Sequence, residues 1–198
     1  MSAATEAAHI AFSDAMSDPH NLISMHEHSR IGKGRRHRET TLNRAAVVLC
    51  VAAWQAYVGD TVKAILDDLA ISAGQPGHAE YQVLKGLVSG SLGRFNTPNA
   101  YNSRGLLNSV GFDPRSSWSF TLSGPNRVYG AASVEKELDE WLAVRHAIAH
   151  GSDLPHKPVL TGWTKAGATI RKRDTERCID FFEHVVGTTA AAAYSPFP

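Results

Sequence analysis

Cysteine is scarce in this sequence of 198 residues, and the two that occur, Cys50 and Cys178, lie far apart. They form no CxxC pair, and each falls within an apolar stretch of helical spacing. Cysteines of this kind are typical of buried thiols in a reducing compartment. The first residues also lack the basic region that opens a secretory signal peptide. We therefore expect a cytoplasmic protein.

Long hydrophobic runs and a strong net charge are also missing. The longest uncharged apolar stretch covers only residues 45–54, well short of the roughly 18 residues that a membrane-spanning helix needs. We therefore expect no association with a membrane. The formal net charge is +1, so no overall electrostatic field marks the chain as a nucleic-acid binder. Any basic surface must be local.

One short segment does concentrate positive charge. Between residues 30 and 38 there are five basic side chains, namely Arg30, Lys33, Arg35, Arg36 and Arg38. A strip of this kind can contact the phosphates of a nucleic acid, or it can be a solvated loop ahead of a helix. The sequence leaves both interpretations open. We take these five residues as candidates for nucleic-acid binding.

The overall composition is that of a globular protein. Hydrophobic residues make up 43% of the chain and charged residues 20%, which excludes a wholly disordered or fibrous protein. The length is near that of one domain. We expect one compact unit, with an N-terminal helical segment and the basic loop at 1–38 and a helical domain at 39–193. Proline clashes with the preceding helical turn, so Pro19 should break or kink the first helix.

Apolar residues recur at three- and four-residue steps in the later segments, as buried helix faces require. The strongest pattern, at about 41–69, predicts the central helix of the core. Further helices are expected at about 79–92, 98–110, 133–150 and 174–193. Thr97 should cap the helix at 98–110 and Ser133 the helix at 133–150. Gly151 should end the helix at 133–150. With a small hairpin near 158–173, the fold class is all-α, with about five to six helices.

The segment that ends the helix at 133–150 carries the strongest chemical signal. Successive helical residues are rotated by about 100°, so His146 and His150 share a face and Arg145 lies beside it. An imidazole titrates near a pKa of about 6.5 and can act as acid or base near neutrality. A guanidinium keeps its proton and grips phosphate oxygens. We therefore take Arg145, His146 and His150 as candidate catalytic residues.

Two other interpretations of these residues stay open. Cationic groups at the C-terminal end of a helix can simply interact with the helix dipole. His146 and His150 also have the spacing of zinc-binding helices, although Ala147 stands where a catalytic Glu would follow the first His. A second group of histidines has no cysteine beside it and surrounds an irregular segment; it comprises His20, His26, His28 and His37. We predict no metal and no cofactor.

Arg145 and His150, separated by four residues, resemble the motif of the HEPN superfamily, an Arg followed after four to six residues by a His. Other segments extend the resemblance to the branch called RiboL-PSP-HEPN. Arg44–Val58, Phe95–Pro98 and Ala149–Gly151 look like successive blocks of that branch. Together the similar segments span roughly residues 44–186. The residue after the Arg is often Asn in the superfamily, and here it is His146.

The resemblance implies a helical bundle that forms a face-to-face homodimer, with the Arg and His of both subunits in one cleft. Many members are metal-independent ribonucleases, often toxins or antiviral effectors, and others bind nucleotides or RNA without known cleavage. We expect an RNA endonuclease in which His150 transfers protons and Arg145 binds phosphate. His146 would position the substrate or supply a second acid. RNA and a neutralising antitoxin are the expected partners. The alternative is a silent module that binds RNA, a nucleotide or a protein.

Overall fold

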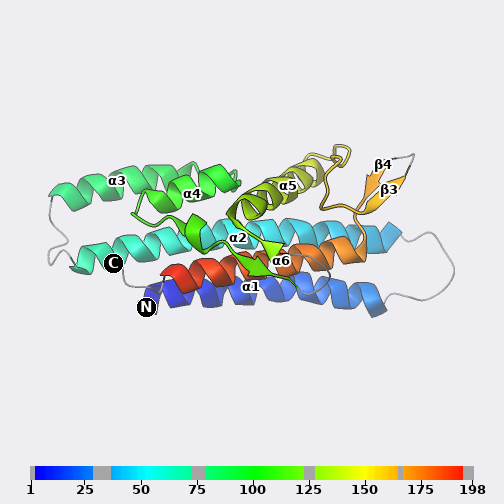
Figure 1. Cartoon of the computed structure of the whole chain (residues 1–198), viewed down its shortest axis with the longest axis horizontal. Helices are drawn as coiled ribbons and strands as arrows, with labels where there is room; N and C mark the ends of the chain where they lie inside the picture. Colours follow the sequence, from blue (N-terminus) through cyan, green and yellow to red (C-terminus); the bar gives the residue numbers. More distant parts are fainter. Residues whose placement is uncertain (1–2, 29–36, 73–78, 123–127, 165–166, 194–198) are drawn as a thin grey trace.

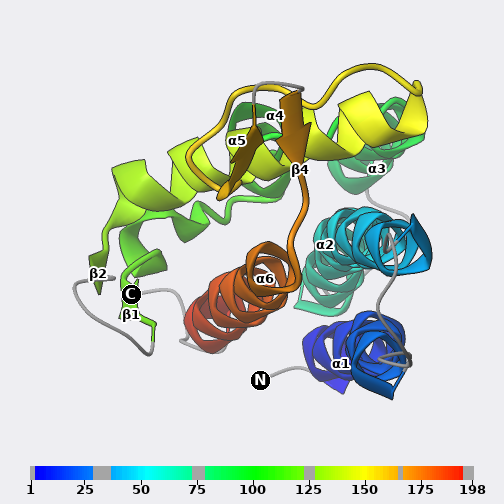
Figure 2. The same ribbon diagram turned by 90° about the vertical axis from the view of Figure 1, so that its right-hand side faces the viewer.

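The computed structural model describes residues 3–28, 37–72, 79–122, 128–164 and 167–193. Within these ranges the chain is an all-α bundle, as predicted. Its helices are α1 (Ala3–His28), α2 (His37–Ser72), α3 (Ala79–Gly93), α4 (Ala100–Asn108), α5 (Ala131–Ala149) and α6 (Lys172–Ala193). Figure 1 shows α1, α2 and α6 side by side, with α3, α4 and α5 laid along the other side of α2. The end-on view in Figure 2 shows the same two groups.

Short elements join these helices. A 3-10 turn, η1 (Pro114–Ser117), and a two-stranded antiparallel sheet of β1 (Phe120–Thr121) and β2 (Val128–Tyr129) lie between α4 and α5. The second sheet, of β3 (Gly162–Thr164) and β4 (Gly167–Thr169), is the predicted hairpin. The connection between α4 and α5 is tied to the core by Trp118, whose fully buried indole donates to Thr189 Oγ1 at 2.9 Å.

The first helix, α1, packs against α2 and α6 along a seam of residues spaced three or four apart. The buried residues of this seam are Thr5, Ala8, Phe12, Met16, Pro19, Ile23 and His26. The predicted break at Pro19 is wrong, because α1 continues through this residue. Met16 and Ile23, on either side of it, are buried in one core cluster that also draws on α2, α5 and α6. This packing offsets the backbone hydrogen bond that proline removes.

The long helix α2 is the centre of the molecule and contacts all five other helices. Its stretch Glu39–Ala70 is long and apolar enough to cross a membrane by length and composition alone. Of the 18-residue window that meets this test, 56% is buried under neighbouring elements of the protein. A central core helix has the same composition because it is surrounded by other helices.

Two helix starts differ from the predictions. Asn99, not Thr97, is the N-cap of α4, and its side-chain oxygen accepts from the backbone N–H of Asn102 at 2.7 Å. The N-cap of α5 is Gly130, so Ser133 lies inside the first turn and does not cap it.

Both cysteines are buried free thiols, as predicted. Cys50 lies on α2 and Cys178 on α6. Burial raises the pKa of the Cys178 thiol well above its usual value, and the neighbouring Cys50 thiol raises it further. The Cys178 thiol therefore stays protonated and acts as a small apolar group between the two helices.

Candidate functional site

The segment between α3 and α4, residues 94–99, is fastened to the central helix by two side chains. Gln55 Nε2 donates to the carbonyl of Phe95 at 2.7 Å, and Trp54 Nε1 donates to the carbonyl of Pro98 at 3.2 Å. Trp54 is fully buried. The segments Arg44–Val58 and Phe95–Pro98, both noted in the sequence analysis, thus meet in space. The loop forms a fixed wall that faces α5.

The end of α5 forms the opposite wall. Gly151 adopts a φ of 63°, a left-handed conformation that favours glycine. Its N–H donates to the carbonyl of Ile148 at 3.2 Å, and the N–H of Ser152 donates to that of Ala147 at 3.0 Å. These two bonds close the last turn, which confirms the predicted end of the helix. They fix the backbone of His150, the last residue before the chain turns away.

A cavity of about 590 Å³ lies between these two walls. The lining consists of Asn96, Thr97, Asn99, Asp139, Leu142, Ala143, Arg145, His146 and His150. The volume is within the range of small-molecule and substrate sites. The structure therefore brings together all three candidate catalytic residues and sets them opposite the α3–α4 loop.

The two histidines present accessible imidazoles to this cavity. The rings of His146 and His150 are both exposed, with centroids 4.2 Å apart and planes inclined at 50°. Neither ring is hydrogen-bonded to a residue that the structure describes. Two groups that can exchange protons near neutrality are thus adjacent and open to a ligand.

Arg145 supplies the charged group of the site. Its Nε is buried and has no hydrogen-bond partner within the described part of the chain. A buried donor without an acceptor costs about 1–3 kcal/mol, and more when it belongs to a charged group. Arg145 as a whole is half-buried and belongs to the lining of the cavity, so its guanidinium offers a permanent positive charge to an anion bound there.

Asp139 is a cavity residue that the sequence predictions missed. Its Oδ1 accepts the backbone N–H of Ala100, the first residue of α4, at 2.9 Å. It therefore joins α4 to α5 at the edge of the cavity. A signal was present in the spacing, because His146 and His150 follow Asp139 by seven and eleven residues and share its helix face.

Replacing Asp139 with alanine should destabilise the protein by about 1 kcal/mol, since it removes an acceptor from the N-terminus of α4. The matched control is Asp153→Ala, which removes an exposed carboxylate with no described partner in the segment after α5. Thermal unfolding followed by circular dichroism compares the two variants with the wild type. Equal melting temperatures for Asp139→Ala and the control would show that this bond contributes nothing.

The histidines near the N-terminus have partners other than a metal. His20 Nε2 lies 2.7 Å from Glu183 Oε1, and His26 Nδ1 lies 2.9 Å from Asn43 Oδ1. The side chains of His28 and His37 lie outside the described residues. Among the side chains that are described, no group of three or more His, Cys, Asp or Glu is placed to hold a metal ion.

The basic strip falls almost wholly outside the described residues. This applies to Arg30, Lys33, Arg35 and Arg36. Arg38 is in the first turn of α2, but its side chain is likewise outside the description. A role for these five residues in nucleic-acid binding stays a prediction.

Comparison with known proteins gives one match. The model of the family described as RiboL-PSP-HEPN matches residues 18–192. No curated protein and no solved structure matches the chain. The matched region begins within α1, ends within α6 and contains every residue that lines the cavity beside α5.

Proposed function

Because this chain belongs to the RiboL-PSP-HEPN family, we propose that it is a metal-independent RNA endonuclease whose active site is the cavity beside α5. The observation that carries the proposal is the guanidinium of Arg145 in the lining of the same cavity as two exposed imidazoles. The first group is suited to hold a phosphate and the others to move protons.

Cleavage without a metal uses the 2′-hydroxyl of the ribose as the nucleophile. His150 takes the proton of this hydroxyl as its oxygen bonds to the adjacent phosphorus. The bond from phosphorus to the 5′-oxygen of the next nucleotide then breaks, and His146, as an imidazolium, protonates that oxygen. Arg145 holds the phosphate and stabilises the negative charge that develops on its oxygens. The products are a 2′,3′-cyclic phosphate and a 5′-hydroxyl.

This mechanism predicts that purified protein cleaves single-stranded RNA in the presence of EDTA and leaves DNA of the same sequence intact. Chelation has no effect because no metal takes part, and DNA survives because deoxyribose lacks the nucleophile. Denaturing gel electrophoresis of labelled oligonucleotides measures both results. Cleavage of DNA, or loss of RNA cleavage on chelation, would contradict the 2′-hydroxyl mechanism.

We propose further that the active form is a homodimer in which each subunit completes the other's site. Support comes from the family and from the histidines themselves, since no hydrogen bond to a described residue orients the ring of His146 or His150, and the two rings contact each other. An orienting group normally fixes the tautomer of a catalytic imidazole. Light scattering should report about twice the 21.4 kDa of one chain. A monomer at micromolar concentrations would contradict the shared site.

The absence of a described orienting group also favours a second candidate function. A HEPN module that binds RNA, a nucleotide or a protein needs Arg145 as an anion-binding group but has no need of oriented imidazoles. The nuclease assay separates the two functions, because a binding module retains RNA without cutting it.

For the active enzyme we propose a cytoplasmic role as a toxin or antiviral effector, neutralised by an antitoxin protein.

A further inference from the structure

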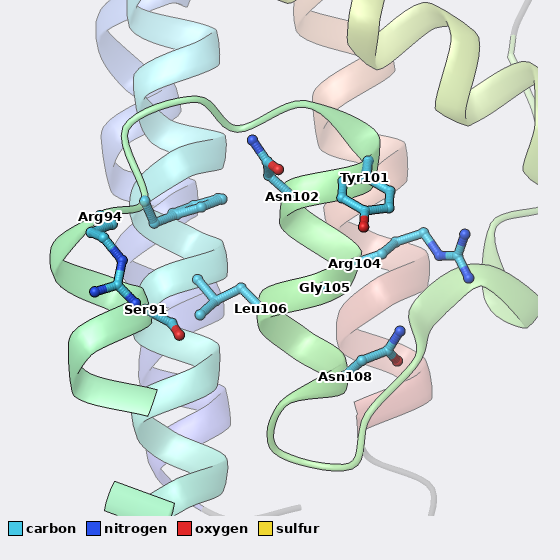
Figure 3. Close-up of a pocket in the computed structure, with 9 residues that line it drawn as sticks. Ser91, Arg94, Tyr101, Asn102, Arg104, Gly105, Leu106 and Asn108 are labelled. Carbon is cyan, nitrogen blue, oxygen red and sulfur yellow. The ribbon is translucent and has the colours of Figure 1, made fainter. Parts of the chain in front are cut away.

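A second cavity, of about 530 Å³, lies on the other side of the α3–α4 loop. Figure 3 shows it between the end of α3 and the exposed side of α4. Its lining includes Arg94 from the end of α3 and Tyr101, Asn102, Arg104 and Asn108 from α4. The lining thus combines guanidinium groups, side-chain amides and an aromatic ring.

Two of these side chains are free to bind a ligand. Arg94 is exposed and makes no ion pair with a described carboxylate. Tyr101 is 84% exposed, so its ring is open to solvent. Arg104, by contrast, is already bound, because its guanidinium donates to Asp113 at 2.8 Å and to Glu135 at 2.9 Å. Arg94 and Tyr101 are therefore the groups that a ligand would meet first.

The second cavity adjoins the catalytic one through a single hydrogen-bonded turn. Asn102 lines the second cavity, while its backbone N–H donates to Asn99 Oδ1 at 2.7 Å and its side chain donates to the Thr97 carbonyl at 2.9 Å. Asn99 and Thr97 both line the catalytic cavity. A single-stranded RNA bound at Arg145 could therefore continue over this turn and reach Tyr101.

We propose that the second cavity binds a nucleotide that flanks the cleaved bond of a single-stranded RNA. The base stacks on the ring of Tyr101, and Arg94 binds a phosphate of the flanking segment. Stacking on an exposed aromatic ring requires an unpaired base, and Arg94, in the lining of the same cavity, can bind a phosphate of the same strand. The inference rests on the proposed nuclease function, because the flanking position is defined relative to the catalytic cavity.

The test measures fluorescence anisotropy with two labelled RNAs, a dinucleotide and a single strand of about eight nucleotides. The full chain carries His150→Ala so that the RNA remains uncut. Adding Tyr101→Ala or Arg94→Ala should weaken binding of the longer RNA by about 5- to 150-fold and leave the dinucleotide unaffected. Tyr101→Phe keeps the ring and should bind normally. The matched control is Lys85→Ala, which removes an exposed cation of α3 outside the cavity.

Three results would overturn the inference, and each has a different consequence for the proposed nuclease function. If Tyr101→Ala and Arg94→Ala bind the longer RNA as tightly as the parent, the second cavity is not a subsite, while the nuclease proposal stands. If both RNAs lose affinity equally, the cavity does not hold a flanking nucleotide. If the parent protein binds neither RNA, the proposed function fails together with the subsite. Both side chains are exposed, so melting temperatures should equal that of the parent.

Discussion

Replacing His150 with alanine should lower the rate of RNA cleavage by about 10²-fold or more, the usual loss when a general acid or base is removed. RNA affinity should change little. The side chain is exposed at the end of α5, so the free energy of unfolding should change only by a dipole-scale amount of about 0.3–1 kcal/mol. Single-turnover cleavage rates, anisotropy with uncut RNA and thermal unfolding measure these three quantities.

Arg145→Ala should differ from His150→Ala in one measurable way. It should weaken RNA binding as well as cleavage, because the variant loses a charge-assisted phosphate contact and the stabilisation of the developing charge. The control for both is His156→Ala, since the His156 ring stacks on Trp163 at 3.7 Å and lies outside the cavity lining. Large losses of melting temperature in both variants, with no activity in the wild type, would make Arg145 and His150 structural residues.

Replacing Arg177 with methionine should destabilise the protein by about 3–5 kcal/mol, the usual cost of leaving one member of a buried ion pair uncompensated. Arg177 on α6 binds the carboxylate of Glu137 on α5 through Nε at 2.9 Å and Nη2 at 2.5 Å. The same carboxylate accepts from Tyr129 at 2.7 Å and from Trp141 at 3.2 Å. Glu137 is only 5% exposed, so water cannot replace the lost partner.

The pKa values of Tyr129 and Arg177 reflect their contacts with the Glu137 carboxylate. Burial and the hydrogen bond to Glu137 raise the pKa of Tyr129 to about 12. Burial by itself would lower the pKa of Arg177, but the hydrogen bond to Glu137 raises it overall. Tyr129 and Arg177 therefore both stay protonated.

Urea denaturation measures the effect, with Arg171→Met as the matched control. Arg171 immediately precedes α6 and is exposed. Its replacement changes the net charge by the same amount as Arg177→Met and should alter stability little. The double variant Glu137→Leu, Arg177→Met should recover most of the lost stability, because it leaves no unpaired charge. If Arg177→Met unfolds at the same urea concentration as Arg171→Met, the pair does not hold α5 to α6.

The sequence was sufficient for those features that depend on residues close together in the chain. The periodicity of α2 and the pairing of β3 with β4 are local, and both were predicted. The convergence of Arg145, His146 and His150 was also predictable, since helical rotation alone sets the relative positions of residues four or five apart. The end of α5 followed from the glycine at position 151, which adopts a left-handed conformation.

Some of the missed features depend on contacts between distant segments. The bond from Ala100 to Asp139 joins residues of two different helices, so no local pattern contains it. The continuity of α1 through Pro19 is likewise decided by its neighbours, because the burial of Met16 and Ile23 outweighs the local penalty. The cap of α4 is a local feature that the sequence left ambiguous, because Thr97 and Asn99 are both residue types that cap helices.

The fastening of the α3–α4 loop to α2 bears on how the proposed RNA substrate would be recognised. A binding loop that must order itself around a ligand loses conformational entropy at that moment, and the observed affinity is reduced accordingly. Here the carbonyls of Phe95 and Pro98 are already held by Gln55 and by the fully buried Trp54. The loop therefore cannot move far without disturbing the core. Discrimination between substrates should depend on complementarity to a preformed surface, with little contribution from induced fit.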